Sequence, residues 1–290
     1  MAAAAGERSA NAAGAAQSQV GAVTMTIRVC VAGATGWTGS AVARQIISSE
    51  GFRLTGAVAR RAAGSDIGTV LGVTPIGVTV APDLEMALGE SADVVIDYTS
   101  PDAIKHNTLF ALEHGVRVVI GTSGLTATDY EEIAAVATMK GLGVIAAGNF
   151  SITAALAKHF SLLAAKYLPS WEIVDYADAR KVDAPSGTVM ELAEELGQVA
   201  RPRGGVPQAE VHGRPDARGA EIDGTHVHSL RLPSYVIAFE TIFGLPNERL
   251  TIRHDAGSGA DPYVAGTLLA AKEVMRVQGL VRGLDRLLFT

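Results

Sequence analysis

The glycine-rich segment at residues 33–39, Gly-Ala-Thr-Gly-Trp-Thr-Gly, limits the possible folds of this chain more than any other feature. It follows an apolar run at 27–32 that is typical of a buried parallel strand, and it precedes a segment at 40–49 with helical spacing. In such a strand–turn–helix unit the glycines permit a tight turn, close approach of the backbone to a pyrophosphate, and close helix–strand packing. The segment predicts a dinucleotide site, with an ordinary turn as the alternative. The expected cofactor-binding residues here are Gly33, Thr35, Gly36, Trp37, Thr38 and Gly39.

Strand-like and helix-like segments alternate at short spacing through the first half of the chain. The predicted strands lie at 27–32, 53–59, 77–81, 93–97, 117–120 and 143–147. The predicted helices lie at 40–49, 83–88, 101–114 and 126–139. This alternation predicts an α/β fold with a Rossmann-type, doubly wound parallel sheet.

After residue 148 the pattern changes. Helices are predicted at 151–167 and 188–197, and strands at 172–178, 225–232, 236–243 and 249–255. The last three strands follow one another without helices, which predicts a second α+β domain with a mixed or antiparallel sheet. We expect the final helix, at 263–277, to return to the first domain. The expected domains are 25–148 with 262–290 for the dinucleotide, 149–261 for substrate binding and oligomerisation, and 1–24 as a disordered extension.

Composition argues against several classes of function. The net charge of −6 disfavours nucleic acid and anionic membrane surfaces as partners, and no apolar run reaches transmembrane length. The single cysteine, Cys30, cannot form an intrachain disulfide and fits a reducing cytosol. The scattered histidines, including His226 and His228, match no metal-ligand pattern. We therefore expect a cytoplasmic protein without a bound metal.

The end of the second predicted strand indicates which dinucleotide is bound. NAD-preferring sites usually carry an acidic residue there for the ribose hydroxyls, whereas this chain has Arg60 and Arg61. Guanidinium groups suit a 2′-phosphate as charges and as planar donors. The pair predicts a preference for NADPH, with NADH possible, and solvated surface arginines are the alternative.

Two further turns follow strands of the same predicted sheet, where ligands of such sheets bind. The segments are Asp-Tyr-Thr-Ser-Pro at 97–101 and Gly-Thr-Ser-Gly at 121–124, and the second can approach a nicotinamide closely because its side chains are small. Plain turn chemistry is the alternative. The cofactor-binding residues expected from this edge and from the end of the sixth strand are Tyr98, Thr99, Gly121, Thr122, Ser123, Asn149 and Phe150.

The segment at 181–188, Lys-Val-Asp-Ala-Pro-Ser-Gly-Thr, has the features of an anion site. Backbone N–H groups and hydroxyls at the start of a helix favour a negative group, and Lys181 adds a full positive charge. Together with the cofactor turn, this predicts hydride transfer to a small acidic molecule. A solvated lysine and a simple helix cap are the alternatives. The expected substrate-binding residues are Ser123, Lys181, Ser186, Gly187 and Thr188.

Taken together, these motifs resemble those of the dihydrodipicolinate reductase family, pyridine-nucleotide enzymes of lysine and diaminopimelate synthesis. The resemblance extends over residues 26–288. It rests on the segments 33–39, 97–99, 121–124, 148–151, 181–188, 250–255 and 279–281. It implies two domains joined by a hinge and a homotetramer built from the sheet of the second domain.

The chain departs from the family pattern where the family has its proposed proton donor. The family pattern is Glu-x-His-His-x-x-Lys, and the positions of the Glu and the two His are Asp175, Ala177 and Asp178 here. A basic residue that many members carry after the last strand is also missing from 256–261. Loss of a general acid typically lowers a rate by about 10²–10⁴. We therefore expect a reductase of this family with an altered substrate or proton route.

Three residues are the candidates for catalysis. Lys181 can hold a carboxylate and also protonate the reduced product, Tyr176 carries a hydroxyl donor, and Asp178 would need a raised pKa, which burial could give. Strand alternation could turn Tyr176 away. One alternative is an authentic 4-hydroxy-tetrahydrodipicolinate reductase that protonates through Lys181 or water. The other is an inactive NADPH-binding sensor.

Overall fold

The computed structural model describes residues 26–89, 92–203 and 205–289, so the extension expected at 1–24 lies outside the described residues. The first layer of the fold is a seven-stranded, all-parallel sheet in the order β12-β6-β5-β4-β1-β2-β3. Its strands are β1 (Ile27–Ala32), β2 (Phe52–Val58), β3 (Val80–Ala81), β4 (Val94–Asp97), β5 (Arg117–Ile120), β6 (Gly143–Ala146) and β12 (Gly279–Arg282). The doubly wound parallel sheet predicted from the alternating pattern is confirmed.

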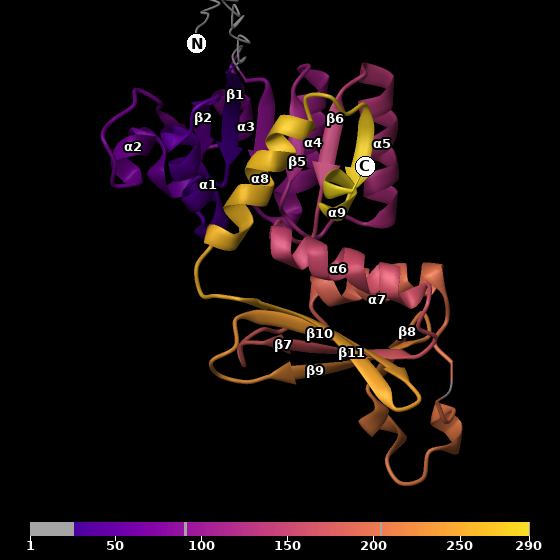
Figure 1. The fold of residues 1–290 in the computed structure, drawn as a ribbon. Helices are drawn as coiled ribbons and strands as arrows, with labels where there is room; N and C mark the ends of the chain where they lie inside the picture. The colour runs from indigo at the N-terminus through magenta and orange to yellow at the C-terminus, as the bar shows by residue number, and fades with distance from the viewer. Residues whose placement is uncertain (1–25, 90–91, 204, 290) are drawn as a thin grey trace, which may run out of the picture.

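Helices cover both faces of this sheet (Figure 1). They are α1 (Trp37–Ser48), α2 (Ile67–Val70), α3 (Leu84–Leu88), α4 (Pro101–Glu113), α5 (Ala127–Lys140), α8 (Asp261–Glu273) and α9 (Asp285–Leu288). Strand β1 is apolar from residue 29 to residue 32 because it is buried there on both faces: Val29 and Val31 face one core, and Cys30 and Ala32 face the other. As predicted, Asp83 caps α3 by accepting from the N–H of Met86 at 2.9 Å.

The second layer is a mixed five-stranded sheet in the order β11-β10-β7-β9-β8. Its strands are β7 (Trp171–Ala177), β8 (Ala220–Ile222), β9 (Thr225–Arg231), β10 (Ile237–Leu245) and β11 (Glu248–Ala256). Strand β7 pairs parallel to β9 and antiparallel to β10, which confirms the predicted mixed sheet. Helices α6 (Ile152–Ala165) and α7 (Gly187–Val199) lie on one face of it, where residues such as Ile173 and Leu192 form the core.

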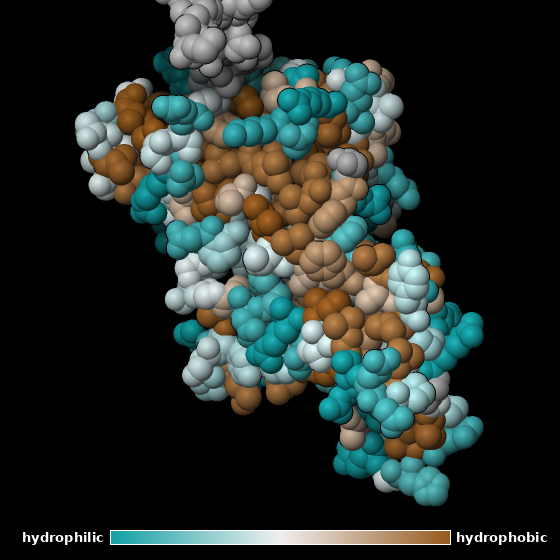
Figure 2. All heavy atoms as spheres, in the orientation of Figure 1, coloured by the Kyte–Doolittle hydropathy of each residue, from teal (hydrophilic) through white to brown (hydrophobic). Residues whose placement is uncertain are grey.

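The long connection between α7 and β8 contains the short turns η2 (Gln208–Glu210) and η3 (Pro215–Arg218), and a similar turn, η1 (Arg60–Ala62), follows β2. In Figure 2, apolar residues gather over α8 and continue along α6, while polar residues surround the lower sheet. No helix among the described residues is long and apolar enough to cross a membrane.

The end of the chain differs from the prediction of a single helix at 263–277. Helix α8 packs against α1 and ends at Glu273, and the chain then adds β12 alongside β6 and the short helix α9. Strand β12 has only four residues, so it carries too little pattern to be recognised locally. Its pairing with β6 is what makes it a strand, and it returns the C-terminal segment to the first sheet.

Candidate functional site

The glycine turn between β1 and α1 lies directly against the end of β4. Gly33 has φ +80°, and a Cβ there would collide with the backbone carbonyl of Tyr98. A Cβ on Gly39 would collide with the carbonyl of Gly33. Gly36 occupies the N-cap of α1 without a side-chain cap, so the first N–H groups of the helix are open to a phosphate. The turn therefore has the close approach that a dinucleotide site requires.

A pocket of about 480 Å³ lies between this turn and the ends of β2 and β4. Its size is in the range of small-molecule sites. Arg60 lines the pocket together with Gly33, Gly36 and Thr99, whereas Arg61 is exposed beside it and is not part of its lining. The other lining residues are Val58, Ala59, Pro82, Asp83, Leu84, Tyr98, Ser100, Asp102, Ala103 and Asn107. Of the remaining residues predicted in the turn, Thr35 and Trp37 are exposed and Thr38 is half-buried.

A buried carboxylate that was not predicted as a site residue organises the strand ends. Asp97 is 0% exposed, and its Oδ1 accepts from the N–H and hydroxyl of Thr99 (2.8 and 2.6 Å) and from the hydroxyl of Thr122 (3.0 Å). Its Oδ2 accepts from Nδ2 of Asn107 at 2.8 Å. Asp97 thereby fixes two predicted cofactor residues on neighbouring strands. The sequence signal that could have identified Asp97 is an acidic residue at the end of an apolar strand.

The side chains of two predicted cofactor residues pack against other residues of the fold, that of Tyr98 half-buried and that of Phe150 buried. The hydroxyl of Tyr98 is 2.6 Å from Oγ1 of Thr267, and burial raises the pKa of Tyr98. Its ring fills the space beside Gly121, where a Cβ would overlap it. Phe150 is 2% exposed and packs edge-to-face on Tyr98. Cofactor contacts of Tyr98 and Phe150 remain predictions. Ser123 is exposed at its strand end.

The start of α7 lies against the end of β6. Asn149 follows β6, and its Nδ2 lies 3.4 Å from Oγ1 of Thr188, while its Oδ1 accepts from the N–H of Ser151 at 2.8 Å. A Cβ on Gly148 would come within 2.8 Å of Glu191. These contacts join the predicted anion site to the carboxyl edge of the dinucleotide sheet, which is where the sequence places the nicotinamide.

At the predicted anion site, Lys181 is paired with a neighbour. Its Nζ lies 2.7 Å from Oδ1 of Asp183, and the lysine side chain is 29% exposed. Burial pushes the pKa of Asp183 upward, but the hydrogen bond and charge of Lys181 outweigh it, so the pKa lies below its usual value. An ammonium group carries three donors, so Lys181 can bind a second carboxylate beside Asp183.

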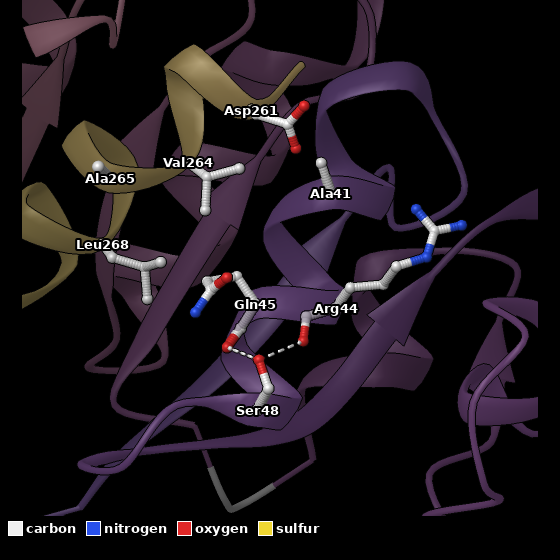
Figure 3. A pocket seen from close by; sticks show the side chains of 8 residues that line it. All are labelled: Ala41, Arg44, Gln45, Ser48, Asp261, Val264, Ala265 and Leu268. Carbon is white, nitrogen blue, oxygen red and sulfur yellow. Dashed lines mark hydrogen bonds between the residues drawn. The ribbon is translucent and has the colours of Figure 1, made fainter. Parts of the chain in front are cut away.

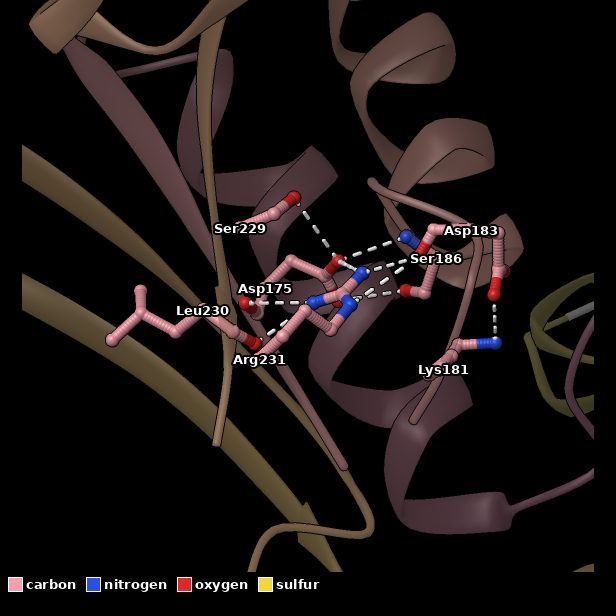
Figure 4. Close-up of polar contacts among 7 residues, drawn as sticks. All are labelled: Asp175, Lys181, Asp183, Ser186, Ser229, Leu230 and Arg231. Carbon is pink, nitrogen blue, oxygen red and sulfur yellow. Dashed lines mark hydrogen bonds and ion pairs between the residues drawn. The ribbon is translucent and has the colours of Figure 1, made fainter. Parts of the chain in front are cut away.

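Ser186 is held by a buried carboxylate, as Figure 4 shows. Its N–H and its hydroxyl both donate to Asp175, each at 2.8 Å, and Asp175 is also paired with Arg231 at 2.7 Å. Gly187, by contrast, is exposed, and Thr188 is half-buried. The donors of Ser186 are therefore occupied within the protein, and Gly187 and Thr188 present the first turn of α7.

The other two predicted catalytic residues lie in unfavourable surroundings. Tyr176 projects from the face of β7 opposite Asp175, where its hydroxyl donates to Glu240 at 2.7 Å, and burial raises its pKa to about 12. Asp178 does not have the raised pKa that it would need as a proton donor. A hydrogen bond from Arg180 lowers that pKa, and the carboxylate is partly exposed. A low pKa is the opposite of what a proton donor requires.

A second pocket, of about 460 Å³, lies between α1 and α8 (Figure 3). None of its lining residues was predicted in the site: they are Ala41, Arg44, Gln45, Ser48, Asp261, Val264, Ala265 and Leu268. Within the described residues, no group of His, Cys, Asp and Glu is arranged to hold a metal ion.

Comparison with known proteins identifies what this arrangement is similar to. Residues 27–150 match the family model "Dihydrodipicolinate reductase, N-terminus" and residues 150–288 match "Dihydrodipicolinate reductase, C-terminus". The 4-hydroxy-tetrahydrodipicolinate reductase of Desulfitobacterium hafniense (strain DSM 10664 / DCB-2) is 39% identical, covering 90% of this chain and 98% of the relative. That of Moorella thermoacetica is 40% identical, covering 91% and 98%.

Solved structures agree with these matches. Dihydrodipicolinate reductase from Paenisporosarcina sp. TG-14, with dipicolinate bound, has a TM-score of 0.77 and 32% identity, covering 90% of this chain and 99% of that one. Amine dehydrogenase from Mycobacterium smegmatis has a TM-score of 0.61 at 17% identity, covering 90% and 95%, and shares the fold alone.

Proposed function

This chain belongs to the dihydrodipicolinate reductase family and is an NAD(P)H-dependent oxidoreductase, and from that premise we propose that it reduces 4-hydroxy-tetrahydrodipicolinate. The observation that carries the proposal is the match of both family models and of relatives named for this activity over nine-tenths of the chain. These findings support the authentic reductase, given above as the alternative, better than a reductase with an altered substrate.

The glycine turn and its pocket fit a bound dinucleotide. The N–H groups in the first turn of α1, after Gly36, would hold the pyrophosphate, and Arg60 at the pocket wall would meet a 2′-phosphate. Thr122 and Ser123, at the end of β5, would face the nicotinamide. When bound, the reduced cofactor supplies the hydride. We propose NADPH as the preferred form because no acidic residue takes the place of Arg60 and Arg61 at the end of β2.

The residues at the start of α7 would bind the substrate. The open N–H groups of Gly187 and Thr188 favour a carboxylate, and Lys181 supplies a positive charge in the same segment while it contacts Asp183. An ammonium group carries three donors and can give up a proton to the reduced product. Lys181, directly or through water, is therefore the proposed proton donor, in place of Tyr176 and Asp178.

A second candidate is a reductase for a different small carboxylate. The observation that favours it is Ala177, which is 0% exposed and occupies the position of the family's proposed proton donor. The neighbouring Asp178 places a negative charge where the family pattern has histidine. Ala177 would be compatible with a substrate that needs no protonation from its side of the site. Asp178 would be compatible with a substrate that carries an ammonium group.

Steady-state oxidation of NADPH distinguishes these candidates. Purified protein should turn over 4-hydroxy-tetrahydrodipicolinate, and Lys181→Met should lower kcat by about 10²–10⁴ while NADPH binding stays unchanged. Turnover only of other cyclic imines or unsaturated acids would favour the second candidate. NADPH binding without oxidation across the panel would favour an inactive sensor and would refute the proposal.

The cofactor preference has its own test. The double variant Arg60→Ser/Arg61→Ser should raise the KM for NADPH by about tenfold or more, the value of one charge-assisted hydrogen bond, and leave that for NADH unchanged. Arg53→Ser is the matched control, because Arg53 is an exposed arginine near the opposite end of β2. An unchanged ratio of the two KM values would contradict the assignment.

We also propose the homotetramer implied by the family resemblance. The face of the five-stranded sheet opposite α6 and α7 carries side chains suited to polar contacts, among them Tyr176, His228, Glu240 and Arg253. Light scattering on the purified protein should give four times the mass of the chain, and the mass of a monomer would refute the homotetramer.

A further inference from the structure

Asp175 is a fully buried carboxylate in the middle of the second sheet. It is 0% exposed and lies on the face of β7 that is covered by α6 and α7. Burying a carboxylate is costly unless it is paired and hydrogen-bonded. Its partners are all polar groups of the site region: the N–H and hydroxyl of Ser186, the hydroxyl of Ser229 at 3.3 Å, and Nη2 of Arg231 at 2.7 Å. Figure 4 shows these contacts converging on one carboxylate.

The contact with Ser186 changes how α7 begins. A serine at an N-cap usually accepts a hydrogen bond from the first turn of its own helix. Here the Ser186 hydroxyl donates to Asp175 instead, and α7 has no side-chain cap among the described residues. The N–H groups of the first turn therefore remain for an acceptor from outside the helix.

Arg231 joins this carboxylate to the segment that carries Lys181. Its Nη2 donates to Asp175 and also to the carbonyl of Asp183 at 2.7 Å, and its Nε donates to the same carbonyl at 3.2 Å. One guanidinium thus cancels the charge of Asp175 and fixes the backbone two residues after Lys181. The several N–H donors of the planar guanidinium allow it to make both contacts at once.

We propose that Asp175 and Arg231 are positioning residues for substrate binding: they hold Ser186 and Asp183 so that the open start of α7 and Lys181 face the same carboxylate. The inference rests on the proposed function of this helix start as a carboxylate site. Arg231 also has a second effect, which is to neutralise Asp175. Without the charge of Arg231, the carboxylate of Asp175 would repel an anion bound at the start of α7.

The test measures binding of dipicolinate and of NADPH to the full-length chain by calorimetry. Arg231→Gln should weaken dipicolinate binding by about 10- to 100-fold, the range expected when a group that orients a binding residue is lost. The double variant Asp175→Asn/Arg231→Gln should bind dipicolinate more tightly than Arg231→Gln, because it also removes the unpaired charge. If Asp175 and Arg231 only stabilised the fold, the double variant would not bind dipicolinate more tightly than the single variant. NADPH affinity should not change in either variant.

The matched control is Asp93→Asn. Asp93 forms a bidentate pair with Arg28 at 2.7 and 3.1 Å, but it lies at the amino end of β4, away from the predicted site. Its replacement should leave dipicolinate binding unchanged. Should Arg231→Gln fail to fold, Arg231→Lys is the replacement variant: it keeps the charge but loses the fork, and dipicolinate binding weaker than that of the wild type is expected.

The outcomes separate two kinds of failure. Wild-type affinity in the Arg231 variant would overturn the positioning role. Equal weakness in the single and double variants would overturn the charge effect assigned to Arg231. Both results would leave the proposed function standing. If the wild-type protein binds NADPH but not dipicolinate, the carboxylate site itself is refuted, and this inference falls with it.

Discussion

The ion cluster around Lys158 gives the sharpest stability prediction. This lysine of α6 has a side chain only 9% exposed, and its Nζ lies 2.6 Å from Glu191 and 2.7 Å from Glu195, both on α7. It also lies 3.4 Å from Asp285 on α9, which belongs to the C-terminal segment beside the first sheet. The cluster therefore links the second layer to the end of the chain, next to the junction of Asn149 and Thr188.

Replacing this lysine with methionine leaves three carboxylates close together without their cation. Removing one partner of a buried ion pair costs about 3–5 kcal/mol. For a domain of this size about 2–4 °C of melting temperature corresponds to 1 kcal/mol, so Lys158→Met should lower the melting temperature by roughly 6–20 °C near neutral pH. Circular dichroism or calorimetry measures this directly.

The loss should depend on pH in a defined direction. Burial raises the pKa of Glu195 even in the presence of Lys158, so the folded protein holds that proton more tightly than the unfolded chain. Without the lysine the carboxylates hold protons more tightly still. Stability of the variant should therefore rise as pH falls from 7 toward the glutamate range, because the folded state then binds the additional protons.

The matched control is Lys105→Met. Lys105 also contacts two carboxylates, Asp129 at 2.8 Å and Glu132 at 2.7 Å, but its side chain is 40% exposed. Solvent screens such a pair, so little change in melting temperature is expected. The argument that burial makes the Lys158 cluster important would be refuted by either of two results. One is an equal change in melting temperature for Lys158→Met and Lys105→Met. The other is a loss of stability in Lys158→Met that does not depend on pH.

Three further predictions concern the first layer. Cys30 is fully buried and burial raises its pKa to about 12, so a thiol reagent such as Ellman's should react only after unfolding; reaction in the native state would contradict the buried position. Gly39→Ala should abolish NADPH binding in a fluorescence titration, because the new Cβ overlaps the carbonyl of Gly33; normal affinity would exclude the close turn. Tyr98→Phe removes the hydrogen bond to Thr267 and should lower the free energy of unfolding by about 1 kcal/mol in urea, and no change would mean that the bond contributes nothing.

Local pattern predicted most of the first layer. A strand segment that is buried on both faces is apolar, and a turn packed closely against a neighbouring strand end requires glycine. Both features can therefore be recognised from consecutive residues. Helix starts are equally local: Asp83 and Pro101 mark α3 and α4 as predicted. The mixed second sheet followed in the same way from strands too close together to have helices between them.

The site was predicted less completely, because its key contacts join distant residues. Lys181 and the Ser-Gly-Thr turn were recognised as one segment, but the partners of Asp175 were not, since Arg231 lies 56 positions away on a neighbouring strand. The raised pKa that Asp178 would need as a proton donor is not found, because the contact with Arg180, two residues along, lowers the pKa of that carboxylate.

The sequence by itself determined the family, the parallel sheet and the chemistry of the two binding segments, because periodicity, glycine and helix-start residues act over a few neighbouring positions. Only the tertiary structure decided which face of β7 each side chain occupies and which carboxylate meets which cation. Ion pairs and buried hydrogen bonds depend on the distance and burial of groups from separate elements, and these are fixed only once the sheets and helices have packed.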